Sequence, residues 1–372
     1  MQPFTITHEE GNARTGTLTT KTKTITTPFF MPVATKGTAK HLTSEALTSL
    51  GTQATISNSF LLSLKPGTAT IKKMGGLGRF MNYPGVTFTD SGGFQMYNKK
   101  FWITTTNEGI HFKNPYNGAK IIISPEDSMN IQKDINSDVA MALDHMPVLE
   151  NSKEEIRKAV ATTTTWAERC KRTHDKLWKK TKKKQLLLGI TQGGIYKDLR
   201  TQSAQTLKAL DMDGYAIGGL ALGETHEQEY AMITTQKSII GKEKLCYLMG
   251  AGNPLELLEA INLGVDCFDS RFPTQNARRG TLFTTIGKLR LLTKKYEHDK
   301  TPLDKYCKCY VCKNYSKAFI RHQLLQHEGA GYQLASYHNL YYLQQLMKKT
   351  QEAIMKGKFK AFHKTLKKVY KE

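Results

Sequence analysis

The stretch GVDCFDSRFPTQNARRG, residues 264–280, joins an apolar run to two aspartates and three arginines. Asp266 and Asp269 are three residues apart, so on a strand their side chains point to opposite faces. Only Asp269 stands at the carboxyl end of the run, and we interpret Asp266 as a structural residue. The same pattern recurs after other apolar runs, at Asp90, Asp144 and Gln192. One such aspartate is usually a cap or turn residue, but the repeated pattern predicts a shared pocket.

The residue types in this predicted pocket suggest its chemistry. Two carboxylates without nearby metal-ligand histidines fit a nucleophile and an acid/base at a glycosidic carbon that keeps its configuration. Gly218 and Gly219 would let backbone groups approach a flat ligand closely. Phe94 and Met249 could stack on an aromatic ring, or they could simply pack in the core. Carboxylate and carboxamide groups match the edges of a purine, so we expect a flat, purine-like base.

A cysteine cluster near the C-terminus has the spacing CxCxxC, formed by Cys307, Cys309 and Cys312, with His338 farther along. Three thiolates and one imidazole complete the tetrahedral shell that is typical of a structural zinc site. We therefore predict one structural Zn²⁺ per chain, and not a catalytic ion, because all four positions are filled. Buried free cysteines are the alternative explanation. The imidazole is the less certain ligand, because the same tail also contains His322, His327 and His363.

Eight short apolar or β-rich runs alternate with segments of helical periodicity. They cover residues 29–35, 52–59, 85–93, 139–145, 186–194, 214–220, 245–252 and 265–270. Strands that alternate with helices pair in parallel, so eight of them predict an α/β fold, the (β/α)8 TIM barrel. An open doubly wound sheet is the alternative. Active sites of TIM barrels lie at the carboxyl ends of the strands, where the aspartates stand.

Three segments fall outside this alternation. Residues 13–27 alternate threonine with other residues and predict an exposed N-terminal hairpin. Residues 95–123 are an aromatic and polar insertion, and residues 281–372 carry the cysteine cluster and lysine-rich helical sequence. We expect two parts: a catalytic barrel with its hairpin, residues 1–280, and a zinc-binding subdomain with C-terminal helices that close the barrel, residues 281–372.

Composition narrows the classes of partner. The 54 Lys and Arg residues exceed the 32 Asp and Glu residues by 22, and the pI is about 9.6. Such an excess indicates a polyanionic partner with a phosphate backbone, or else a solvated lysine-rich surface. Hydrophobic residues make up 39% of the chain, which supports a sizeable core. Because no signal peptide or membrane-spanning run is evident, we expect a soluble protein in the cytoplasm, with reduced cysteines.

Six motifs in order resemble the tRNA-guanine transglycosylases, or queuine tRNA-ribosyltransferases, of the bacterial type. They are TDSGGFQ (89–95), GITQGG (189–194), IGGLALGE (217–224), YLMGAG (247–252), FDSRFPTQNARRG (268–280) and the CxCxxC…His tail. The resemblance runs from residue 13 to the C-terminus. It implies a TIM barrel with an inserted zinc subdomain, exchange of the wobble guanine of tRNA for a 7-deazaguanine base, no nucleotide cofactor, and a homodimer.

The resemblance also implies roles for individual residues. Asp269 corresponds to the nucleophile that forms a covalent bond with the ribose of tRNA, and Asp90 to the general acid/base. The residues that would read or stack on the base are Asp144, Gln192, Gly219, Leu220, Phe94 and Met249. Arg278 is the clearest anticodon contact, and Gln275 and Arg279 belong to the same tRNA-binding segment.

Several residues depart from the pattern of the family. His145 and Met146 follow Asp144 where bacterial members usually carry Glu-Cys, which leaves the incoming base open. Leu222 stands where the eukaryotic enzymes, which use the larger base queuine, have glycine. This bulky side chain favours a compact base such as 7-aminomethyl-7-deazaguanine. Gln275 replaces an arginine, and Phe94 replaces a tyrosine.

Two other functions are compatible with these motifs. One is a non-catalytic tRNA-binding subunit, which the presence of both Asp90 and Asp269 disfavours. The other is a relative that acts on DNA, on another tRNA position or with another base. The stretch FPTxxxRxG disfavours this second alternative, although Gln275 weakens the argument.

Overall fold

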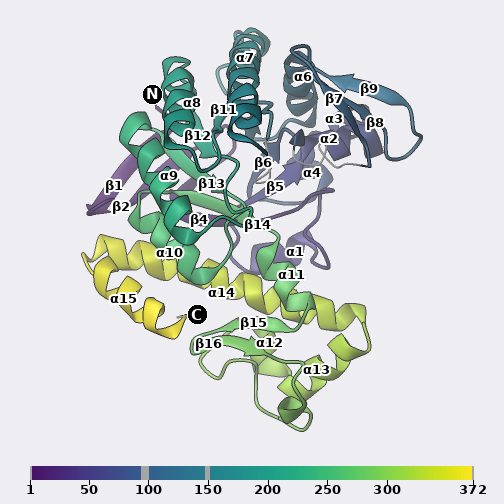
Figure 1. Cartoon of the computed structure of the whole chain (residues 1–372). Helices are drawn as coiled ribbons and strands as arrows, with labels where there is room; N and C mark the ends of the chain where they lie inside the picture. The colour runs from purple at the N-terminus through teal and green to yellow at the C-terminus, as the bar shows by residue number, and fades with distance from the viewer. Residues whose placement is uncertain (1, 94–99, 147–150, 371–372) are drawn as a thin grey trace.

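The computed structural model describes residues 2–93, 100–146 and 151–370, and eight parallel strands form its central sheet (Figure 1). They are β4 (Phe29–Pro32), β5 (Ala54–Asn58), β6 (Val86–Asp90), β10 (Val139–Met141), β11 (Leu186–Thr191), β12 (Gly214–Ile217), β13 (Leu245–Met249) and β14 (Cys267–Ser270). The strand order is β4-β14-β13-β12-β11-β10-β6-β5. A parallel bridge between Val33 and Ile56 joins the two ends of this order. The predicted TIM barrel is therefore confirmed, and the doubly wound alternative is wrong.

The interior of the barrel is filled by every second residue of the strands. Val86 and Phe88 of β6, Leu188 and Ile190 of β11, and Tyr247 of β13 belong to one buried cluster. Because side chains alternate between the two faces of a strand, the next inward positions are residues 90, 192 and 249. The interior column of apolar side chains thus continues into polar residues at the carboxyl ends of the strands.

Helices surround the barrel and follow the strands in sequence. They are α1 (Ser44–Ser49), α2 (Ser59–Leu62), α3 (Thr68–Lys73), α4 (Leu77–Phe80), α6 (Pro125–Ile135), α7 (Lys153–Trp178), α8 (Lys197–Ala209), α9 (His226–Ile240) and α10 (Pro254–Asn262), with an irregular turn η1 (Ser63–Gly67). Capping boxes start several of them, as at Ser124 of α6 and Ser152 of α7. In the described part of the chain, no helix combines enough length and hydrophobicity to cross a bilayer.

The N-terminal segment forms a three-stranded antiparallel sheet of β1 (Phe4–Glu10), β2 (Ala13–Thr19) and β3 (Thr24–Thr27). The expected hairpin is present, but its predicted exposure is wrong, because residues 13–16 of β2 are buried. Phe4, Leu18 and Ile25 join the cluster that fills the barrel interior. The sheet thus covers the amino end of the barrel. This burial depends on β1, the strand on the other side of β2, which was not predicted. The threonine pattern alone therefore gave no sign of it.

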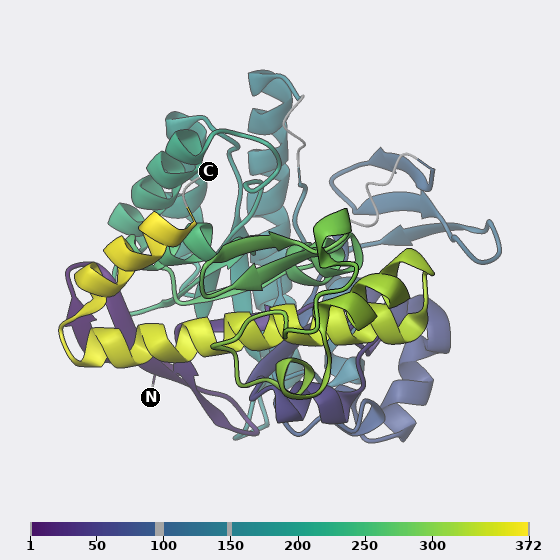
Figure 2. The same ribbon diagram turned by 90° about the horizontal axis from the view of Figure 1, so that it is seen from below.

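The insertion after β6 folds into a second antiparallel sheet of β7 (Trp102–Thr105), β8 (Ile110–Lys113) and β9 (Lys120–Ile123). One end of this sheet is held by α7, where Trp166 donates a hydrogen bond to the Asn107 carbonyl, 3.0 Å away. Phe112 of β8 packs edge-on against Phe60 of α2, with ring centroids 4.6 Å apart. In Figures 1 and 2 the sheet projects from one side of the barrel.

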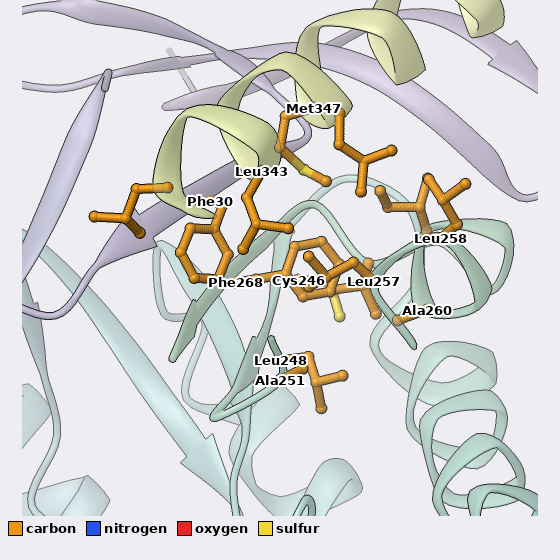
Figure 3. Close-up of a cluster of buried hydrophobic side chains, with 14 of the residues drawn as sticks. Phe30, Cys246, Leu248, Ala251, Leu257, Leu258, Ala260, Phe268, Leu343 and Met347 are labelled. Carbon is orange, nitrogen blue, oxygen red and sulfur yellow. The ribbon is translucent and has the colours of Figure 1, made fainter. Parts of the chain in front are cut away.

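The chain beyond β14 begins with α11 (Phe272–Arg278) and a β-hairpin, and ends in helices. The remaining elements are β15 (Thr281–Thr284), β16 (Gly287–Arg290), η2 (Lys294–Tyr296), α12 (Tyr310–Asn314), α13 (Lys317–Leu325), α14 (Gly329–Met355) and α15 (Phe359–Val369). Figure 2 shows α14 as a long helix that crosses beside the barrel. Leu343 and Met347 of α14 pack with Phe30 of β4 and Phe268 of β14 (Figure 3). This helix thus covers the barrel wall between the first and last strands.

Candidate active site

A cavity of about 350 Å³ lies at the carboxyl ends of the barrel strands. Its lining includes seven of the predicted site residues: Asp90, Asp144, Gly219, Leu220, Met249, Asp269 and Gln275. Gln192 is fully buried beside it, and Phe94 lies outside the described residues. A larger and more open depression of about 600 Å³ is lined by residues of α1 and α4 and contains none of the predicted site residues.

Asp269 ends the inward-facing column of β14 and accepts two hydrogen bonds on one carboxylate oxygen. The Tyr247 hydroxyl donates to Oδ1 over 2.6 Å, and the Gly250 amide donates to the same atom over 3.1 Å. Burial raises the pKa of the Asp269 carboxyl above its ordinary value, while these two donors and the nearby Arg271 oppose the rise. Among the described residues, no hydrogen bond to the second oxygen, Oδ2, is present.

Asp90 ends the inward-facing column of β6 and has a different electrostatic environment. Its carboxylate accepts a hydrogen bond from the Gly92 amide over 2.9 Å, and the Asn58 side chain also favours the ionised form by lowering the pKa. Burial, followed by the negative charge of Asp269, raises the pKa of Asp90 to about 8. At neutral pH the cavity therefore holds a protonated Asp90 beside a second carboxyl group.

Asp144 and Gln192 form a buried pair on one wall. Gln192 Nε2 donates to Asp144 Oδ2 over 2.7 Å, and the Ser91 hydroxyl lies 3.3 Å from Oδ1. Burial raises the pKa of Asp144 to about 6, and the bonds from Gln192 and Ser91 counteract that effect. Gln192 Oε1 has no hydrogen-bond partner among the described residues. A buried acceptor of this kind is suited to a donor on a bound ligand.

The diglycine after β12 is required by the close approach of Gln192. A Cβ atom on Gly219 would lie 2.5 Å from Gln192 Oε1, and Gly219 has a φ of +65°. A Cβ atom on Gly218 would lie 2.7 Å from Gln192 Nε2. The buried Arg200 of α8 fixes this loop by donating to the Gly218 carbonyl over 2.9 Å and to the Gly194 carbonyl over 2.8 Å.

The side chains that depart from the family pattern separate into two groups. Met146 and Leu222 both line the cavity and add apolar surface to it. His145 does not line the cavity; its ring stacks on Trp166, with centroids 6.3 Å apart. Burial lowers the pKa of His145 to about 4, so this imidazole is neutral at physiological pH. Of the two residues after Asp144, Met146 is therefore the one that shapes the cavity.

The first aspartate of the stretch 264–280, Asp266, has a structural role, as predicted. Asp266 is fully buried just before β14, and Arg14 of β2 donates to both of its oxygens, over 2.8 Å and 2.6 Å. The Cys246 amide donates to Asp266 Oδ2 over 2.7 Å. This ion pair joins the N-terminal sheet to the barrel and lies outside the cavity.

The predicted tRNA-binding residues lie on or next to α11, directly after Asp269. Gln275 lines the cavity, whereas Arg279 is exposed at the end of the helix. Arg278 is partly buried, and its Nη1 has no hydrogen-bond partner among the described residues. Burial and the charges of Arg271 and Arg279 lower the pKa of Arg278. The segment thus presents concentrated positive charge next to the cavity.

The four predicted metal ligands come together in the C-terminal segment. The sulfur atoms of Cys307, Cys309 and Cys312 lie 3.9, 3.6 and 3.4 Å from His338 Nδ1. All four donor atoms lie within 4.8 Å of one another and could hold a metal ion. His338 Nε2 lies 2.8 Å from the Phe283 carbonyl, which fixes the tautomer and leaves Nδ1 as the ligand atom.

Two functional residues were missed in the sequence. Tyr247 hydrogen-bonds to Asp269, and Arg200 fixes the diglycine loop. Strand alternation could have revealed Tyr247, because it precedes Met249 by two residues and so points to the same side. No local signal identifies Arg200, because its bonds reach carbonyls in two different loops.

Comparison with known proteins gives one consistent result. Residues 9–372 match the family model described as Queuine tRNA-ribosyltransferase. Proteins with this name from Clostridium perfringens (strain 13 / Type A) and Fusobacterium nucleatum are each 42% identical to the chain, over 363 and 361 residues. These alignments cover 96% of the chain and 96% and 95% of the relatives. A Streptococcus agalactiae protein of the same name is 44% identical over 92% of the chain and 89% of its own length. The chain therefore belongs to the queuine tRNA-ribosyltransferase family.

Proposed function

We propose that this protein is a tRNA-guanine transglycosylase that exchanges the wobble guanine of a tRNA for a 7-deazaguanine base. The observation that supports this most strongly is the pair Asp90 and Asp269 in one cavity, with different hydrogen-bond partners and charge environments. Base exchange with retained configuration at the ribose requires two inversions, hence a nucleophile and a group that manages protons. The two carboxyl groups suit these two tasks.

In the first displacement, the Asp269 carboxylate attacks the anomeric carbon of the target ribose. The bond between this carbon and guanine breaks, and Asp90, protonated at neutral pH because its pKa is about 8, gives its proton to the departing base. The Tyr247 hydroxyl and the Gly250 amide occupy Asp269 Oδ1, which leaves Oδ2 as the attacking atom. The product is a covalent ester between Asp269 and the ribose.

In the second displacement, Asp90 acts as the base. Its carboxylate takes the ring N–H proton of the incoming 7-deazaguanine, and the nitrogen attacks the anomeric carbon. The ester to Asp269 breaks, so both carboxyl groups return to their starting protonation states. This cycle needs no nucleotide cofactor, because one glycosidic bond replaces another of similar energy.

The wall opposite the nucleophile would recognise the base. Asp144 and Gln192 offer carboxylate and amide groups, and the unpartnered Gln192 Oε1 can accept a hydrogen bond from a guanine-type ring. We assign the Gly219–Leu220 backbone to the same task. Met249 would stack on the ring from one side, and Phe94 is proposed to stack from the other.

The incoming base is proposed to be compact, with 7-aminomethyl-7-deazaguanine as the first candidate. Leu222 and Met146 narrow the cavity with apolar side chains, and this disfavours a bulky substituent such as that of queuine. The assay below therefore includes guanine, 7-aminomethyl-7-deazaguanine and queuine as alternative incoming bases.

The remaining parts would hold the tRNA. Arg278 and Arg279 are proposed to contact the anticodon loop beside Gln275, and the net charge of +22 favours binding of the phosphate backbone. An unpaired loop lets a single base be turned into a pocket. We further propose a homodimer in which one subunit catalyses while the other helps hold the tRNA, and a structural Zn²⁺ on the Cys307–His338 cluster.

Incorporation of radiolabelled guanine into unmodified tRNA with a GU-containing anticodon tests this proposal. We expect incorporation that unlabelled 7-aminomethyl-7-deazaguanine suppresses at lower concentration than queuine does. Failure to incorporate guanine into any tRNA would favour the non-catalytic subunit. Incorporation into DNA, or into tRNA without a wobble guanine, would favour a relative with another target.

A further inference from the structure

The insertion sheet β7–β8–β9 has one end held by α7 and one end that carries aromatic and basic side chains. Its register pairs Trp102 with Phe112 and Lys113 with Lys120, so Trp102 and both lysines lie at the same end, with Trp102 on the Phe112 face and both lysines on the other face. The Lys113 amide also bonds to the Phe101 carbonyl over 2.7 Å. The turn between β8 and β9, which carries Tyr116, is at this end too. We call this the aromatic–lysine end of the sheet.

Its side chains are exposed although two of them are large aromatics. Trp102 is 42% exposed and Tyr116 is 47% exposed. The indole lies along β7, held by a 3.1 Å hydrogen bond from Nε1 to Thr105 at the other end of this strand. Lys65 Nζ lies 5.5 Å from the centre of the Tyr116 ring. Exposed aromatic faces that are held in place and accompanied by lysines are typical of surfaces that bind single-stranded nucleic acid.

Charge at this end is of one sign. Residues 100–123 contain three lysines, Lys100, Lys113 and Lys120, against a single acid, Glu108. Glu108 lies in the β7–β8 connection, at the opposite end of the sheet. A second copy of this chain is a poor partner, because a twofold contact would bring these lysines together. A polyanion complements them.

The aromatic–lysine end is also within reach of the candidate active site. Gly93 lines the cavity, and Lys100 follows it by seven residues, so an extended chain limits their separation to roughly 25 Å. RNA that places one base in the cavity would have its neighbouring nucleotides in this range.

We infer that the aromatic–lysine end of the insertion sheet binds unpaired nucleotides of the anticodon arm near the base in the cavity. Trp102 and Tyr116 would stack on bases, and Lys113 and Lys120 would contact phosphates. This inference rests on the proposed function for the identity of the RNA, but binding can be measured without base exchange.

The test compares two double variants that lose the same charge. Lys113→Gln/Lys120→Gln removes lysines of the sheet, and Lys182→Gln/Lys183→Gln removes exposed lysines before β11, at the amino end of the barrel. The probe is a fluorescent, unmodified anticodon stem-loop with a wobble guanine, titrated by anisotropy at several salt concentrations. We expect the sheet variant to bind about three- to tenfold more weakly, with a salt slope reduced by about 1.4 for two phosphates of a single strand.

Two further measurements make the result specific. Trp102→Ala, a change at an exposed side chain, should weaken binding at least about fivefold. In base exchange it should raise the KM for tRNA and leave kcat unchanged. The inference is wrong if the sheet variant binds RNA like the control variant. It is also wrong if either sheet change alters the oligomeric state of the protein, measured as its molar mass in solution, and leaves its RNA affinity unchanged. If the variants lose RNA affinity as expected but the wild-type protein exchanges no base, the proposed function is wrong and this inference stands.

Discussion

At the scale of single residues, the surroundings of two aspartates favour different ionisation states of the same side chain. Asp269 accepts hydrogen bonds from Tyr247 and Gly250, which favour its ionised form. Asp90 is buried and faces the charge of Asp269, which favours its protonated form. Because one of two neighbouring carboxyl groups ionises first, the pair is arranged to hold one proton.

Asp269→Asn removes the proposed nucleophile while keeping the size of the side chain. We expect guanine exchange to fall by at least about 10³-fold, because a carboxamide cannot form the ester intermediate. Single-turnover assays and denaturing gels for the covalent protein–RNA adduct measure this. A thermal melt serves as the control for folding. Exchange within tenfold of the wild type would show that Asp269 is not the nucleophile.

The raised pKa of Asp90 predicts a limb in the pH profile. The group is protonated below about pH 8 and loses its proton above it, so kcat/KM should fall about tenfold per unit as pH rises beyond 8. At low pH the rate should fall as Asp269 becomes protonated. Tyr247→Phe removes a donor to the ionised Asp269, so it should move this acid limb to higher pH. A profile that stays flat to pH 9.5 would contradict the role of Asp90.

At the scale of elements, the site depends on two adjacent segments, the carboxyl end of β11 and the turn after β12. Gln192 can lie beside Asp144 only because Gly218 and Gly219 lack side chains. Arg200 of α8 fixes the carbonyls on both sides of this contact. The shape of this cavity wall is therefore set by how closely the diglycine backbone approaches Gln192, and not by flexible side chains.

Gly219→Ala should displace Gln192, because the new Cβ would lie 2.5 Å from Oε1. We expect the KM for the free base to rise at least about tenfold as Gln192 and Asp144 lose their positions. Gly11→Ala is the matched control, since Gly11 also has a φ of +65° but a Cβ added there would meet no atom within 4 Å. Both variants should lose about 1–2 kcal/mol of stability from backbone strain, but only Gly219→Ala should lose base affinity. Equal kinetics in the two variants would contradict this role.

At the scale of the whole molecule, the C-terminal segment and the barrel are connected through α14. His338 near the start of this helix belongs to the metal cluster, while Leu343 and Met347 pack on the barrel strands (Figure 3). Gln344 Nε2 donates to the Phe30 carbonyl of β4 over 3.0 Å. A metal on this cluster would therefore bind a residue of a helix that also covers the barrel. The division of the chain at residue 280 stays a prediction.

Cys309→Ser tests this connection. We expect the purified variant to lose most of its zinc and to melt at least about 5 °C lower, because structural zinc contributes directly to folding free energy. Elemental analysis by mass spectrometry and a thermal melt measure the two effects. Cys170→Ala is the control: it changes a buried cysteine that does not belong to the cluster, so the variant should keep the metal. A Cys309→Ser protein with full zinc content and wild-type melting would contradict the site.

Local pattern in the amino-acid sequence was enough to place the strands, the family and the metal cluster. All eight barrel strands were located, because short apolar or β-rich runs that alternate with segments of helical periodicity are a local signal. Motifs around Asp90 and Asp269 led to the correct family, and the CxCxxC spacing identified the metal cluster. The separation of Asp266 from Asp269 also followed from strand alternation alone.

Features that depend on long-range closure emerged only from the folded chain. β6 and β14 are separated in the sheet by β4 and β5, and closure of the barrel brings the charges of Asp90 and Asp269 close enough to shift a pKa. Burial of β2 depends on β1 and on the barrel end that it covers, which no local threonine pattern reports. Burial and charge proximity are sums over many distant segments. Residue type and spacing specify which groups can react, and the closed barrel sets their protonation.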